Sequence, residues 1–220
     1  MRFLLMDTCG SEGSVALADT ESAQVVVATE VLPGRTSSER LVPAVRRLME
    51  SRGWVLRELV AVGVVHGPGS FTGVRVGLSA AKGLSEASGV PLVAVSRLAL
   101  LAAGVSDREA VVHAVLDAGR GEFYYGEYAG RRCVREALLT RDEVEAAVVG
   151  GIVVVCEAKV AEALAGLSVR VVREPLAADA LPFALEQVAA GEFDDAMTLD
   201  ANYLRRSVAE IFAKPKSVVG

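Results

Sequence analysis

The chain has 220 residues, 52% of them apolar and only 5% aromatic, and carries a formal net charge of −5 at pH 7. This composition is that of a folded protein whose core is mostly Val, Leu and Ala, and the length allows one large domain or two small lobes. The acidic balance argues against a broad nucleic-acid-binding face.

Three scattered cysteines without a CxxC pair argue against a disulfide framework and against a cysteine zinc site. The first residues, MRFLLMDTCG, hold an apolar run too short for a signal peptide, and no run approaches the roughly 18 residues of a membrane helix. We therefore expect a soluble protein of the reducing cytoplasm.

The first half of the chain predicts strands at residues 3–7, 14–18, 24–31, 59–65 and 92–96. The stretch Thr36-Ser-Ser-Glu39 has the capping-box form and predicts a helix that Gly53 ends. Because Pro43 lies inside it, we expect this helix either to kink there or to begin near Arg40. A second helix is predicted over residues 72–88, and a short Leu/Ala helix ends at about residue 103.

The second half repeats this order of elements. Strands are predicted at 111–117 and 122–128, followed by a further strand, a helix at 140–148, a strand at 152–156 and a helix at 157–167. The order βββαβα thus occurs twice, and Asp7 and Asp117 each end the first strand of a copy. This order indicates the duplicated, ribonuclease H-like α/β fold of actin, hexokinase and Hsp70, in which two Asp-ended hairpins grip the phosphates of ATP between the lobes.

We expect one lobe to comprise residues 1–103 with about 198–220, and the other to comprise residues 104–197. The tail, residues 199–220, is expected to pack a helix onto the first lobe. Fold alone does not give function.

The glycine-rich stretch HGPGSFTGVRVG, residues 66–77, is either a phosphate-binding turn or a means of packing a helix closely. A Walker loop needs Lys and a hydroxyl residue after its last glycine, whereas Gly73 is followed by Val74 and Arg75. The Rossmann spacing is also absent. A helix N-terminus attracts anions through its free N–H groups, so nucleotide binding stays open as the minor alternative.

The helix that this turn opens has one narrow polar stripe and is apolar or small on nearly every other side. Each interior Gly costs about 1 kcal/mol relative to Ala. Close approach of another backbone offsets that cost. The chain's own sheet accounts for one side of the helix, and the second side calls for a partner within the fold or in another chain. Packing is therefore the favoured interpretation.

Candidate catalytic groups are few. Asp7 and Asp117 could hold magnesium or act as bases, but Asp also caps tight turns. His66 and His113 are solitary, so a metal-dependent hydrolase lacks its ligands. Ser70 has no GxSxG frame. The cysteines are expected to be inert core residues.

Several stretches match one family: residues 4–8 (LLMDT), 14–17 (SVAL), 40–43 (RLVP), 67–75 (GPGSFTGVR), 89–96 (GVPLVAVS), 116–122 (LDAGRGE) and 202–205 (NYLR). On these motifs the chain resembles the TsaB (YeaZ) family, accessory proteins of bacterial tRNA N6-threonylcarbamoyladenosine (t6A) biosynthesis. The resemblance covers nearly the whole chain and is weakest from about residue 131 to 181.

The resemblance implies a degenerate relative of the catalytic subunit TsaD. Arg97 and Leu101 stand where TsaD has two metal-binding histidines. Such proteins pair with TsaD through the first two helices of each chain, in a four-helix bundle, and recruit the ATPase TsaE. TsaD would transfer the threonylcarbamoyl group to N6 of adenosine 37 in tRNAs reading ANN codons.

On this basis we expect the chain to be a scaffold and not an enzyme. We expect it to bind no cofactor alone, with ATP, Mg and a metal ion in the partner subunits. We also expect it to contact tRNA only through the complex, to contact no membrane, and to form a homodimer in isolation.

The partner interface is expected on helices 40–52 and 72–88. The small residues would allow close approach, Pro43 and Val76 would supply apolar contact, and the charged residues would fix the register. The candidate residues are Arg40, Pro43, Arg47, Gly73, Arg75, Val76, Gly77, Ser79, Ala80, Lys82 and Gly83.

A vestigial nucleotide cleft is expected at Asp7, Thr8, Ser11, Gly69, Ser70 and Asp117. The alternative function is a nucleotide-binding ATPase or small-molecule kinase of the actin-like superfold, with Asp7, Thr8, Ser11 and Asp117 around the nucleotide. An endopeptidase is a second rival, and the missing ligands count against it.

Overall fold

The structure, a computed structural model, describes residues 1–105 and 111–204 and contains two five-stranded sheets. The first holds β1 (Arg2–Asp7), β2 (Gly13–Asp19), β3 (Val26–Leu32), β4 (Ala61–Val65) and β5 (Leu92–Val95). The second holds β6 (Val111–Gly119), β7 (Glu122–Ala129), β8 (Arg132–Thr140), β9 (Ile152–Val155) and β10 (Val169–Val171). The predicted tail helix falls largely outside the described residues.

Both sheets have the same topology. Their orders are β3-β2-β1-β4-β5 and, taken from the other edge, β8-β7-β6-β9-β10. In each, the first three strands are antiparallel, and the fourth and fifth run parallel to the first. The duplicated α/β fold predicted from the order of elements is therefore confirmed.

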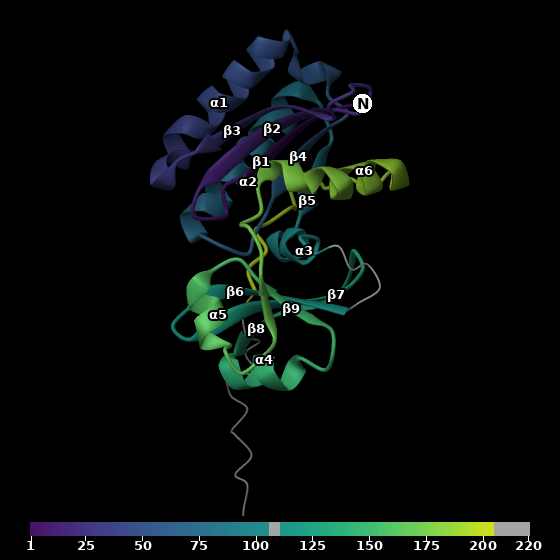
Figure 1. The fold of residues 1–220 in the computed structure, drawn as a ribbon. Helices are drawn as coiled ribbons and strands as arrows, with labels where there is room; N and C mark the ends of the chain where they lie inside the picture. The colour runs from purple at the N-terminus through teal and green to yellow at the C-terminus, as the bar shows by residue number, and fades with distance from the viewer. Residues whose placement is uncertain (106–110, 205–220) are drawn as a thin grey trace, which may run out of the picture.

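The helices are α1 (Ser37–Arg52), α2 (Phe71–Ser88), α3 (Arg97–Ala102), α4 (Arg141–Ala147), α5 (Ala158–Ala163) and α6 (Leu181–Ala190). Short 3₁₀ turns are η1 (Gly34–Thr36), η2 (Leu56–Glu58) and η3 (Ala177–Ala180). Figure 1 shows α1 and α2 beyond one face of the first sheet, α6 beyond the other, and α3 between the two lobes.

The boundary between the lobes differs from the prediction. η3 contacts β1, β2 and β4, and α6 contacts β4 and β5. Both elements therefore pack on the first sheet and form part of the first lobe. The lobe expected at residues 104–197 therefore loses Ala177–Ala190. Leu181, Phe183 and Ala184 of α6 are buried, because an apolar sheet face must be covered by another element.

The start of α1 also differs from the prediction. The Thr36 hydroxyl donates a hydrogen bond to the carbonyl oxygen of Pro33, at 2.7 Å, and does not cap the helix, because the 3₁₀ turn η1 runs straight into it. The helix does not begin near Arg40 and includes Pro43. Pro43 leaves the Glu39 carbonyl without its helical donor, and because Glu39 and Pro43 are both exposed, water can take the place of that donor. Gly53 ends the helix with φ near 63°, as expected.

Two glycines of α2, Gly73 and Gly77, pack the helix against Thr8, the residue that follows β1. A Cβ on Gly73 would overlap the backbone oxygen of Thr8, and one on Gly77 would overlap the Thr8 hydroxyl. That hydroxyl donates to the Gly73 carbonyl oxygen at 2.6 Å. The prediction that Gly73 and Gly77 admit a partner helix is therefore wrong, because Thr8 already occupies the space they leave. Gly83 has no atom within 4 Å of its would-be Cβ.

This contrast yields a matched pair of substitutions. Gly73→Ala should lower the free energy of unfolding by roughly 2 kcal/mol, since the new Cβ meets backbone that cannot yield. Gly83→Ala should raise it by about 0.5–1 kcal/mol, because Ala loses less entropy in a helix and meets open space. Urea unfolding of the two variants tests this, and equal effects would contradict the assignment of their faces.

Candidate functional site

The surface of α1 and α2 that turns away from the first sheet is the first candidate site. We call it the outer face and define it by exposed or half-buried residues of both helices: Arg40, Val42, Pro43, Val76, Ser79, Ala80, Lys82 and Gly83. Val42 is 54% exposed although it is a large apolar residue. Val76 and Ala80 are half-buried and pack against the core.

The first turns of the two helices meet at one cavity. Ser38 of α1 and Val76 of α2 both line it, and both helices begin there. Residues four apart lie above one another on a helix, so Val42 follows Ser38 and Ala80 follows Val76 one turn further on. The outer face is thus formed by two contacting helices of the same direction, and its residues include small and apolar side chains.

Of the four charged residues predicted for the interface, two make contacts within the chain and two form no ion pair. Arg47 pairs with Glu30 of β3 at 2.5 Å, and Arg75 stacks on the Phe71 ring at 3.3 Å from its centroid. Both are therefore engaged within the chain. Among the described residues, Arg40 and Lys82 have no ion-pair partner.

An aromatic cluster at the start of α2 was not predicted. Phe71 is 59% exposed, and its ring lies 6.0 Å from that of Tyr203, with the Arg75 guanidinium 5.2 Å from the Tyr203 centroid. It fastens the segment before residue 205 to α2. Tyr203 lies more than 130 residues from Phe71, and the sequence carries no local signal of such a contact.

The turn between β1 and β2 is the second candidate site. Three of its predicted residues, Thr8, Ser11 and Ser70, line the cavity at the helix starts, whose volume is about 290 Å³. Ser70 caps α2 by accepting from the Gly73 N–H at 3.3 Å. Gly69 lies against the turn, because a Cβ there would overlap the Cys9 carbonyl oxygen.

Asp7 is buried beneath this turn and is 2% exposed. Its carboxylate accepts a hydrogen bond from the Cys9 N–H at 2.8 Å, which is the turn-capping alternative considered above. Burial raises the pKa of Asp7, and the nearby charge of Arg97 opposes that rise.

Arg97 joins the turn to residues 172–176, which lead from β10 to η3 and which we call the crossing segment. It is 4% exposed and pairs with Glu174 at 2.5 Å. Glu174 also accepts from Ser11, and although burial opposes it, the carboxylates around Arg97 raise the pKa of the guanidinium. Leu101, the other position implied by the resemblance, is fully buried in the core.

Asp117 is not among the residues that line the cavity at the β1–β2 turn. Lys159 donates to its carboxylate at 2.6 Å, and the Asp117 N–H donates to Glu157 at 2.8 Å. Partial burial alone would raise the pKa of Asp117, but the hydrogen bond from Lys159 holds it below the ordinary value. Both Asp-ended turns are therefore already bonded within the chain.

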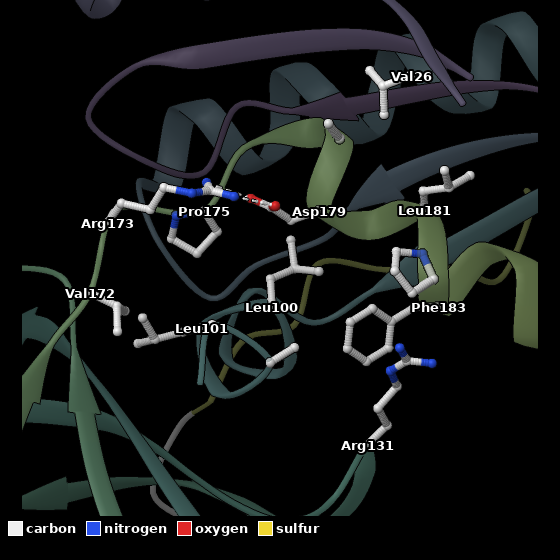
Figure 2. A pocket seen from close by; sticks show the side chains of 14 residues that line it. Val26, Leu100, Leu101, Arg131, Val172, Arg173, Pro175, Asp179, Leu181 and Phe183 are labelled. Atoms are coloured by element: carbon white, nitrogen blue, oxygen red, sulfur yellow. Dashed lines mark hydrogen bonds and ion pairs between the residues drawn. The ribbon is translucent and has the colours of Figure 1, made fainter. Parts of the chain in front are cut away.

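A cavity of about 550 Å³ lies among α3, the crossing segment and α6. Figure 2 shows Leu100 and Phe183 pointing into it, with Arg173 joined to Asp179 and Arg131 beside Phe183. Arg131 forms an ion pair with Glu186, and Arg173 one with Asp179 at 2.5 Å. Because both guanidinium groups are neutralised, the cavity has no free charge on its lining arginines to select a ligand.

Residues 1–105 and 111–204 contain no cluster of three His, Cys, Asp or Glu side chains that could hold a metal ion. His113 is buried between the Tyr125 hydroxyl and the Gly150 carbonyl oxygen. Cys9 is buried, which raises its pKa well above the ordinary value, whereas Cys133 is exposed and so is not the core residue expected. In this part of the chain, no helix is long and apolar enough to cross a membrane.

The duplicated sheets and the paired Asp-ended turns define a two-lobed α/β protein of the actin–hexokinase type. The activator of 2-hydroxyisocaproyl-CoA dehydratase from Clostridium difficile has a related fold, with a TM-score of 0.51 at 12% identity, covering 87% of this chain and 97% of that one.

A family model described as TsaD, tRNA N6-adenosine threonylcarbamoyltransferase, matches residues 27–170. YeaZ from Pseudomonas aeruginosa has a TM-score of 0.79 at 29% identity, covering 92% of this chain and 99% of that one. A Pseudomonas aeruginosa protein with similarity to peptidase YEAZ has a TM-score of 0.78 at 30% identity, covering 93% and 99%.

The chain is similar to the tRNA threonylcarbamoyladenosine biosynthesis protein TsaB of Escherichia coli K12, with 36% identity over 58% of this chain and 55% of that protein. Identity with TsaB of Bacillus subtilis 168 is 32%, over 66% of this chain and 62% of that protein. The chain thus spans less than two thirds of these curated relatives. It belongs to the TsaB/YeaZ family, within the wider TsaD-like family, as the motifs predicted.

A pH series tests whether Asp7 is a structural carboxyl group. A raised pKa means that Asp7 contributes stability below its unfolded value of 3.8, and that this contribution is lost as the pH rises through the folded value. Asp7→Asn keeps an acceptor for the Cys9 N–H and does not titrate. The melting temperature of the variant relative to the unmodified chain should therefore rise from about pH 4 to about pH 7. A relative fall would show that the carboxylate charge stabilises the fold.

Proposed function

We propose that the chain is a non-catalytic subunit of t6A biosynthesis. It pairs with TsaD through the outer face, helps recruit TsaE, and thereby supports threonylcarbamoyl transfer to N6 of adenosine 37 in tRNAs reading ANN codons. The relatives that carry the TsaB name support the pathway.

The outer face is the observation that carries this proposal. It presents two parallel helices that contact each other and carry the exposed Val42 and the half-buried Val76 and Ala80, while the opposite sides of these helices pack on the chain's own sheet. Two such helix pairs bury these side chains against each other in a four-helix bundle. Because TsaD belongs to the same wider family, its first two helices offer a matching surface, and the interface is pseudo-symmetric.

The residues expected at a vestigial nucleotide cleft support a non-catalytic role. Arg97 and Leu101 stand at the positions that the resemblance assigns to metal ligands, and neither side chain is a plausible ligand. Asp7 and Asp117 are held by hydrogen bonds within the chain. In this proposal TsaD supplies the metal, the nucleotide chemistry and the main tRNA contacts.

Reconstitution tests the role. With TsaC, TsaD and TsaE of the same organism, t6A should form on tRNA only when this chain is added. Product at full rate without the chain would overturn the proposal.

Gly83→Leu tests the face. Its Cβ points into open space, so the variant should fold at least as well as the unmodified chain, yet the new side chain blocks a close partner helix. We expect binding to TsaD to weaken by at least about tenfold, with t6A formation falling to the level seen without the chain. The variant should also shift the isolated chain from homodimer to monomer in sedimentation.

Ala189→Leu is the matched control, because Ala189 is an exposed helix residue on α6, beyond the opposite face of the sheet. It should leave TsaD binding and t6A formation unchanged. Equal effects of the two variants would argue that the outer face is not the interface.

A further inference from the structure

Three segments that are far apart in the sequence meet at the carboxylate of Glu174. Ser11, in the β1–β2 turn, donates its backbone N–H to Glu174 Oε1 at 2.8 Å and its hydroxyl to Oε2 at 2.6 Å. Arg97, the first residue of α3, donates from Nη2 to Oε1 at 2.5 Å. Glu174 itself lies on the crossing segment between β10 and η3.

The groups around this carboxylate are fixed in position, as in an anion-binding site. The Arg97 side chain is 5% exposed, and its Nε has no hydrogen-bond partner among the described residues. Gly10 lies against both groups, because a Cβ there would overlap Glu174 Oε1 and lie 2.8 Å from Arg97 Nη2, so a larger residue would displace these side chains. A buried guanidinium that lacked an anionic partner would be costly, so this pocket demands a negative charge.

The donors are those of an oxyanion site. A backbone N–H, a hydroxyl and a guanidinium converge on two oxygens of one anion, which is the donor set that carboxylates and phosphates share. The second lobe has a different contact of the same kind at its own Asp-ended turn, where the N–H of Asp117 donates to the carboxylate of Glu157 at 2.8 Å. Each turn of the duplicated fold is thus bonded to an acidic side chain of the chain itself.

We propose that Glu174 is an internal ligand, whose carboxylate fills an oxyanion site formed by Gly10, Ser11 and Arg97. It fastens the crossing segment to the first lobe and excludes free phosphate. The site accepts an external oxyanion only when the Glu174 side chain is absent or withdrawn. This inference concerns the isolated chain and does not depend on the pairing proposed above.

The test removes the internal ligand and supplies an external one. Melting temperatures of Glu174→Ala are measured in sodium phosphate, sodium acetate and sodium chloride at equal ionic strength, and phosphate binding is measured by calorimetry. We expect the variant to melt about 5 °C or more below the unmodified chain in chloride. Phosphate and acetate should restore part of that loss, with phosphate binding on the order of millimolar. The unmodified chain should bind no phosphate in this range.

Two controls separate this from a general effect of charge. Glu186→Ala removes the carboxylate of the Arg131 ion pair on α6 and should show no response specific to phosphate or acetate. Glu174→Gln keeps the side-chain volume, so it should be less stable than the unmodified chain without responding to anions. If Glu174→Ala folds only when phosphate is present, that dependence itself supports the proposal.

Two results would overturn the inference. One is a Glu174→Ala chain that folds and responds to phosphate no more than Glu186→Ala does. The other is phosphate binding by the unmodified chain as tight as that of the variant, which would mean that Glu174 does not hold the site. Neither result bears on whether the chain supports t6A formation, so the two proposals fail separately.

Discussion

The contact of Thr8 with α2 is the constraint on which the rest of the structure depends. The Thr8 hydroxyl donates to the Gly73 carbonyl oxygen at 2.6 Å, and the Ser70 N–H donates to the Cys9 carbonyl oxygen at 2.9 Å. Together they fix the β1–β2 turn against the start of α2. The turn then presents Ser11 toward Glu174 on one side and toward the helix starts on the other. The close contact between Thr8 and Gly73, possible only with glycine at position 73, therefore fixes the position of the outer face and of the groups around Glu174.

The same contact explains the electrostatics around the β1–β2 turn. Arg97 lies near two carboxylates, Asp7 beneath the turn and Glu174 beside it, and only Glu174 forms an ion pair with it. Asp7 keeps a raised pKa because burial outweighs the attraction of Arg97. Beside the turn, the Arg97 guanidinium and the Glu174 carboxylate are thus paired charges that cannot dissociate from the chain.

Local patterns in the sequence predicted the fold but only part of the candidate site. Buried apolar runs, the Asp-ended strands and the helix-ending Gly53 and Gly89 act within a few residues, so the order of elements was predictable. The neighbour that each glycine packs against was not predictable. A small residue allows close approach equally well when the neighbour is backbone of the same chain and when it is a partner helix. Glu174 could not be found either, since 163 residues separate it from Ser11 and an isolated acidic residue in a segment without periodicity carries no signal.

The roles of the three α2 glycines follow from helical geometry. Gly73 and Gly77 are one turn apart, whereas Gly83 is rotated by roughly 120° from Gly77, which takes it off the face that packs on Thr8. Helix α2 therefore carries two small-residue faces, one occupied by Thr8 and one open. The proposed pairing with another helix pair depends on this open face of α2 together with the exposed residues of α1.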